Sequence, residues 1–185
     1  MAKPMGIPRF VRKNVNPRLR TGPMGIAFGR FVAELLGAEN PDPLPSGPWP
    51  LVIEHALVHR DRYEPVERAW VEIAVGLRDH LTNPVGPPAG PAADDPWHRP
   101  DPPVRRFVFA TSARMPNPAH VDQLRQLRDE IHQFFHTLAE KHPHLAHLAA
   151  LEVEVLDWDA LVALLRRRPQ LIFRWFPRTS PSGRG

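Results

Sequence analysis

Three side chains that can bind a metal recur at helical spacing in the segment HVDQLRQLRDEIHQFFHTLAEK. His132 and His136 are four residues apart, and Glu140 follows after another four, so one face of a helix can carry all three. Two imidazoles and a carboxylate in this arrangement could hold a transition metal. The same residues flank the apolar pair Phe134 and Phe135, and we favour a histidine pair on the surface of an amphipathic helix.

The basic residues are concentrated at the two ends of the chain. Residues 1–30 contain lysine and arginine but no acid, and no acid follows Asp159. The whole chain has 24 basic and 20 acidic residues. Residues 31–165 hold all 20 acids but only 11 of the basic residues, so the middle of the chain is acidic. Basic ends favour an anionic partner, most often nucleic acid, through phosphate contacts and counterion release. The alternatives are solvated tails, or tails that bind the acidic middle of the same chain. The candidate nucleic-acid-binding residues are Arg9, Arg12, Lys13, Arg18, Arg20, Arg166, Arg167, Arg168, Arg174 and Arg178.

An aromatic cluster lies within the second basic region. The segment FRWFPR, residues 173–178, sets Trp175 between two arginines, where an indole could stack on bases or contact a partner protein. Because the apolar residues Leu171 and Ile172 precede it, we favour a segment that folds back and completes the core.

Length and composition indicate one domain in a reducing compartment. A chain of 185 residues with 42% apolar content can build a single core. It has no cysteine, which excludes disulfides and thiolate zinc sites and fits a cytoplasmic protein. The first residues show neither a secretory signal nor a membrane span, so we expect no membrane partner.

Apolar patterns predict an alternation of helices and strands. We expect a first helix within the segment 25–39, ending at Gly37. A long helix is expected to begin near Asn117 and Pro118. A last helix at 160–168 is capped by Asp157 or Asp159. The expected strands are LVIEHALVH (51–59), RAWVEIAVGL (68–77), VRRFVFATS (104–112) and LEVEVLDW (151–158). For residues 68–77 a helix remains the alternative.

This order predicts an α/β fold with a central mixed sheet flanked by helices, whose last strand–helix–strand crossover is parallel. We expect residues 1–25 to form an extended basic arm and residues 169–185 a basic C-terminal tail. Residues 26–168 then form the domain, with a proline-rich loop at 83–103.

Three stretches resemble one known family. FGRFVAELL (28–36), RRFVFATSARMPNPAHVDQL (105–124) and LEVEVLDWDALVALL (151–165) are similar to the restriction-endonuclease-like fold of the PD-(D/E)XK nucleases, in particular its Mrr-like branch. That branch occurs in bacterial restriction and defence proteins. The resemblance would place RAWVEIAVG at the catalytic strand of the family.

The resemblance implies a metal-dependent site in which one strand carries an acid and the next carries Glu/Asp-x-Lys. Glu72 then falls at the second acid and is the candidate metal ligand, while Glu54 or Asp61 could supply the first. Ala74 stands where the lysine belongs, although Arg78 could reach inward. The cofactor would be Mg²⁺ or Mn²⁺ if the site is catalytic, and the alanine favours a degenerate copy.

Three functions remain in competition. The leading hypothesis is a nucleic-acid-associated protein of a defence, restriction or mobile-element system, with a degenerate restriction-endonuclease-like domain. The second is a structural or assembly subunit whose basic arms bind partner subunits or further copies of the chain. The third is an active metal-dependent nuclease.

Overall fold

The computed structural model describes residues 23–37, 51–58, 61–83, 97, 103–115 and 117–175 of the 185. Its elements are α2 (Pro23–Leu36), β1 (Leu51–Ala56), α3 (Tyr63–Thr82), β2 (Arg106–Thr111), α4 (Pro118–Lys141), the 3₁₀ helix η4 (Pro143–Ala150), β3 (Glu152–Leu156), α5 (Trp158–Arg166) and α6 (Pro169–Trp175). Within these residues no helix is both long enough and apolar enough to cross a membrane.

The three strands form one parallel sheet in the order β1-β2-β3. Leu51 pairs with Arg106 at the start of the β1–β2 ladder, and Arg106 pairs with Glu152 on its other side. The α/β class and the parallel last crossover are confirmed. The expected mixed sheet is wrong for the part of the chain that the structure describes, because a helix follows each strand and returns the chain to the starting edge.

The central strand β2 is covered on both faces. Phe107 and Phe109 point to one face, while Val108 and Ala110 point to the other, and all four are buried. This explains the continuous apolar run in its sequence, which is typical of parallel strands that have helices on both sides.

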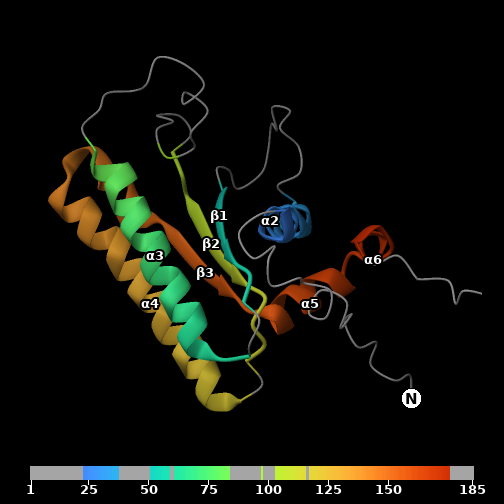
Figure 1. Ribbon diagram of the computed structural model, residues 1–185. Coiled ribbons are helices and arrows are strands. Elements are labelled where there is room, and N and C mark those ends of the chain that lie inside the picture. The colour runs from blue at the N-terminus through green and yellow to red at the C-terminus, as the bar shows by residue number, and fades with distance from the viewer. Residues whose placement is uncertain are drawn as a thin grey trace, which may run out of the picture.

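Two cores lie on opposite faces of the sheet (Figure 1). The first core lies under α3 and α4 and contains a group of aromatic rings, namely Trp70, Trp97, Phe107, Phe109 and Phe135. The second lies under α2, α5 and α6 and contains Phe28, Phe31, Val32, Leu35, Trp158 and Leu161. Both crossover helices, α3 and α4, cover the same face, as expected when successive crossovers of one hand step in one direction across the sheet.

Residues 68–77 are helical and not a strand, which corrects the sequence prediction. They lie inside α3, whose buried side chains are Val66, Trp70, Leu77 and Leu81. These positions are four, seven and four residues apart, which is one or two helical turns, so they line one face of a helix. The apolar run suggested a strand because the window of residues 68–77 excluded Val66 before it and Leu81 after it, and these two residues complete the helical pattern.

Side-chain caps fix the start of α4 and α5. The side chain of Asn117 accepts a hydrogen bond from the backbone N–H of Ala119, and that of Asp157 accepts one from Ala160. Of the two acids considered for α5, Asp157 is therefore the cap. At the end of α2, Gly37 adopts a φ of +78°, which confirms the predicted stop.

Helix α6 is formed by residues assigned to the C-terminal tail. Its last residue, Trp175, packs edge-on against Phe31 of α2, with ring centroids 5.7 Å apart. The indole N–H also donates to a carboxylate oxygen of Glu34, a buried residue of α2. The chain therefore folds back onto the domain up to Trp175, as favoured from the apolar residues before it.

Candidate functional site

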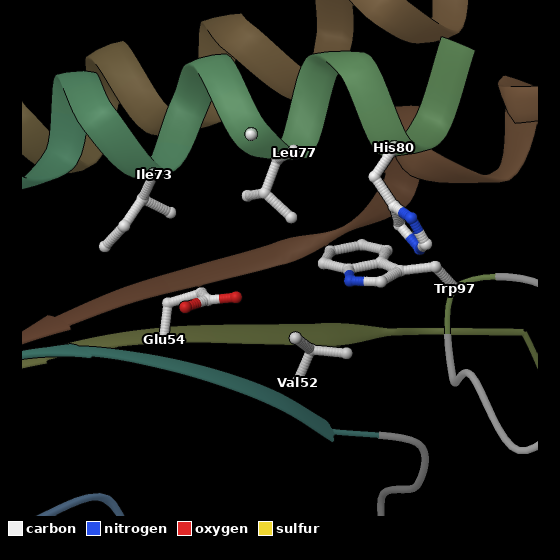
Figure 2. A pocket seen from close by; sticks show the side chains of 7 residues that line it. Val52, Glu54, Ile73, Leu77, His80 and Trp97 are labelled. Carbon is white, nitrogen blue, oxygen red and sulfur yellow. The ribbon is translucent and has the colours of Figure 1, made fainter. Parts of the chain in front are cut away.

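Glu54 lies on β1, on the sheet face that α3 and α4 cover. Alternation along the strand gives Val52, Glu54 and Ala56 the same orientation, and the first and last of them belong to the core under α3. A hollow of about 510 Å³ surrounds the carboxylate and is called the Glu54 hollow; it is lined by Val52, Glu54, Ile73, Gly76, Leu77, His80 and Trp97. Figure 2 shows the carboxylate between β1 and the side chains that project from α3.

The carboxyl group of Glu54 is half-buried and unpaired within the described part of the chain. Desolvation by burial raises its pKa above the ordinary value. No hydrogen bond or ion pair reaches this carboxyl from any residue that the structure describes. A titratable group in an apolar hollow with a shifted pKa is a candidate for ligand recognition or proton transfer.

Aromatic side chains form the other end of the Glu54 hollow. The indole of Trp97 is buried and stacks on Phe135, with centroids 5.5 Å apart and an angle of 25° between the rings. His80 projects from the last turn of α3 beside this indole (Figure 2). The hollow thus combines apolar walls with one acid and one imidazole, a composition suited to a ligand with an apolar body and a single polar group.

The structure does not give Glu72 the position that the family motif requires. Glu72 is exposed on α3, while Ala74 packs against the core. On a helix, two residues separated by one position point in opposing directions, whereas on a strand they share a face. The expected placement of Glu72 on a catalytic strand is therefore wrong.

Asp61 lies near the carboxyl ends of β1 and β2, where its side chain is hydrogen-bonded to the backbone. One of its carboxylate oxygens accepts a hydrogen bond from the backbone N–H of Arg114, at 2.9 Å. Of Glu54, Asp61 and Glu72, only Glu54 lines the hollow. Within the described ranges, no three histidine, aspartate or glutamate side chains are grouped so that they could hold a metal ion. A single carboxylate does not fit Mg²⁺ or Mn²⁺, which prefer several oxygen ligands.

The histidines of α4 form a pair on the surface of the helix. The imidazole Nδ1 of His136 lies 3.4 Å from a carboxylate oxygen of Glu140. The rings of His132 and His136 are 6.4 Å apart, and His132 is exposed. The interpretation as a surface pair agrees with this geometry.

The arginine triplet at the end of α5 divides into two kinds of residue. Arg166 and Arg167 are exposed. Arg168 is half-buried, and its Nη1 donates to the backbone carbonyl of Glu34 at 3.1 Å. Arg168 therefore stabilises the C-terminus of α2. The other candidate nucleic-acid-binding residues lie outside the described part of the chain; they are Arg9, Arg12, Lys13, Arg18, Arg20, Arg178 and the side chain of Arg174.

Charge differs between the two helical layers. Acids outnumber basic residues in α3 and α4, which carry Glu64, Glu67, Glu72, Asp79, Asp122, Asp129, Glu130 and Glu140 against Arg68, Arg78, Arg125, Arg128 and Lys141. On the opposite face, α2 and α5 expose Arg30, Arg166 and Arg167, which have no ion pair within the described ranges. We call this opposite surface the basic face. The basic ends and acidic middle of the sequence indicate this charge difference, and the topology of the sheet places the two kinds of segment on opposite faces.

No protein-family model, curated protein or solved structure matches the chain. Among the described residues, the two faces differ: one carries an unpaired acid in an apolar hollow, and the other carries exposed arginines without acid partners.

Proposed function

We propose that the chain is a nucleic-acid-associated protein whose basic face contacts the phosphate backbone. The observation that carries this proposal is that both basic segments of the sequence are joined to helices on one face of the sheet. Residues 1–22 precede Pro23 of α2, and residues 176–185 follow Trp175 of α6. The exposed arginines of α2 and α5 lie in the same layer.

Both points of attachment belong to the same helical layer. Trp175 contacts Phe31 of α2 at 5.7 Å between ring centroids. Pro23 lies about 12 Å from Phe31 along the helix axis, at 1.5 Å per residue. Cations from both ends of the chain can therefore act on one stretch of a polyanion, where they release condensed counterions together.

The restriction-endonuclease-like origin of the domain is proposed from its three similar stretches of sequence, while the stretch expected at the catalytic strand, residues 68–77, is part of α3. The stretch 28–36 lies in α2, the stretch 105–124 covers β2 and the start of α4, and the stretch 151–165 covers β3 and α5. The acid of a Glu-x-Lys motif can be placed on β1 instead of α3, because Glu54 and Ala56 share a face of that strand. Alanine again stands at the lysine position, which favours binding without cleavage and a degenerate member of a restriction or defence system.

Binding of labelled duplex DNA and of single-stranded RNA, measured by fluorescence anisotropy between low and physiological salt, tests the proposal. The informative variant replaces Arg30, Arg166 and Arg167 with alanine. For duplex DNA each lost phosphate contact lowers the slope of log K against log salt by about 0.9, so three lost contacts lower it by about 2.7. We expect weaker binding and a flatter slope.

A matched control removes the same charge from the opposite face. Arg68, Arg125 and Arg128 are exposed on α3 and α4, and their replacement by alanine lowers the net charge equally. If binding depended only on net charge, both triple variants would lose affinity equally, and the basic face would be rejected as the contact surface. Absence of binding by the parent at low salt, together with salt-independent self-association, would instead favour the assembly role.

Cleavage is tested separately with Mg²⁺ and Mn²⁺. We expect the parent protein to show no activity above a blank purification. Metal-dependent cleavage that is lost in Glu54→Gln but retained in Glu72→Gln would show an active nuclease centred on β1.

A further inference from the structure

A second hollow lies between the C-terminal halves of α3 and α4, two helices that run side by side on the acidic face (Figure 1). Its volume is about 540 Å³, and we call it the Arg78 groove; it is lined by Arg78, Thr82, Gln133, Phe134, Thr137, Leu138, Lys141 and His142. No acid belongs to this lining, although the two helices are acidic overall. The groove is therefore a local exception to the charge of its own face.

The two cations of the groove, Arg78 and Lys141, are not paired with any carboxylate of the described residues. The guanidinium carbon of Arg78 lies 5.5 Å from the centre of the Phe134 ring, an arrangement that holds the cation over the aromatic face. Neither Arg78 nor Lys141 forms an ion pair with any part of the chain that the structure describes. The neighbouring acid Glu140 is paired with His136 instead.

Three neutral polar side chains line the groove, namely Thr82, Gln133 and Thr137. Gln133 donates an N–H to the hydroxyl oxygen of Thr137 at 3.3 Å, which leaves the hydroxyl proton of Thr137 available to a ligand. Thr82 donates its own hydroxyl to the carbonyl of Arg78 at 2.7 Å and closes the last turn of α3. Available donors beside two cations are suited to a ligand with several acceptor oxygens.

The helix ends do not cancel this positive charge. The groove lies near the C-termini of α3 and α4, each of which carries roughly half a negative elementary charge. Two helix ends therefore contribute about one negative charge, whereas Arg78 and Lys141 contribute two positive charges, before any protonation of His142. The sum remains positive, so neutralisation of the helix ends accounts for only part of the cluster.

We propose that the Arg78 groove binds a phosphate group, held by Arg78 and Lys141 and by the hydroxyl of Thr137. This site lies on the face opposite the basic face and is independent of the proposed nucleic-acid contact there. The phosphate can belong to a phosphorylated small molecule or to a nucleic-acid backbone, since both present the same oxyanion.

The test is a titration of the full-length protein with inorganic phosphate against chloride of equal ionic strength. Binding is followed by NMR of the histidine imidazoles, with His142 in the groove and His120 near the start of α4 as internal reference. We expect saturable shifts at His142 that are absent at His120. The variant Arg78→Gln with Lys141→Gln should raise the dissociation constant at least about tenfold.

The control is Arg68→Gln with Arg125→Gln, which removes one cation from each of the same helices outside the groove. Lys141→Gln alone, at the exposed end of α4, keeps the test valid if the loss of Arg78 disturbs packing on Phe134. A non-saturable response, or equal loss of affinity in the groove variant and the control, would overturn the proposal. If phosphate binds, tighter binding of adenosine monophosphate identifies a small phosphorylated ligand, and tighter binding of a short oligonucleotide identifies the backbone.

Discussion

A methyl group added at Gly29 tests how closely α2 packs on the sheet. An ideal Cβ at this position would lie 2.6 Å from Cε1 of His55 and 3.0 Å from its Nδ1. The imidazole would have to move, but its ring already packs edge-on against Phe28, with centroids 5.9 Å apart. The absence of a side chain at Gly29 therefore permits the observed approach of α2 to β1.

The two energetic effects of Gly29→Ala have opposite signs. Alanine in a helix interior is favoured over glycine by about 1 kcal/mol. Overpacking against His55 costs about 1–3 kcal/mol. We expect a net destabilisation of up to about 2 kcal/mol, which lowers the melting temperature by about 2–4 °C for each kcal/mol in a chain of this size.

Gly76 provides the matched control within the same protein. It lies in the interior of α3, and a Cβ there would meet no atom within 4 Å. Gly76→Ala should therefore stabilise the chain by about 1 kcal/mol.

The His55→Ala background isolates the contact, because Gly29→Ala should become stabilising there. Urea unfolding of the parent, Gly29→Ala, His55→Ala and the double variant should give a coupling energy of about 1–3 kcal/mol between the two positions. Equal stabilisation by Gly29→Ala and Gly76→Ala in the parent would refute the close packing of α2 on β1.

Three further predictions concern single residues. Asp157→Ala should cost about 1 kcal/mol by removing the cap of α5, while Asp157→Asn, which keeps an acceptor, should cost less; chemical denaturation compares them. Burial raises the pKa of Glu54 above its ordinary 4.5, so the folded chain retains a proton that the unfolded chain releases. Stability should thus fall as pH rises from 4.5 through the folded pKa, and Glu54→Gln should be more stable than the parent at neutral pH but not at low pH in thermal melts. Arg168→Ala should lower stability by about 1–2 kcal/mol, whereas Arg166→Ala and Arg167→Ala should leave the melt unchanged.

Local patterns were sufficient for the elements that are buried on both sides or strongly amphipathic. The short continuous apolar run predicted β2 because both of its faces are buried, and the apolar stripe predicted α4 because its burial follows the helical period. The cap at Asp157 was predictable for a similar reason, since an acid before an apolar helical run satisfies the N–H groups of the first turn.

Residues 68–77 were misread because a short apolar run fits either period. In α3 the valines Val71 and Val75 are exposed, with 55% and 53% of their surface accessible. They place apolar residues on the solvent face of the helix and so obscure the difference between its two faces. Only the wider window that includes Val66 and Leu81 shows buried residues spaced by one or two helical turns. Because of this error, Glu72 was expected to be the second catalytic acid. The acid that lies in an apolar hollow is Glu54, and the residues around it come from segments distant in the sequence, namely α3 and Trp97.

The arginine triplet shows why a run of charge does not by itself locate an interface. In the sequence Arg166, Arg167 and Arg168 are equivalent, but the backbone carbonyl of Glu34 accepts a hydrogen bond from Arg168. Because the C-terminus of α2 carries a partial negative charge, this guanidinium is already partly neutralised in the folded chain. A phosphate at the basic face would therefore meet Arg166 and Arg167, while Arg168 would act by fixing α2 against α5. Loss of Arg168 should then weaken nucleic-acid binding only under conditions that also loosen the fold, whereas loss of Arg166 and Arg167 should flatten the salt dependence of binding in a fully folded protein.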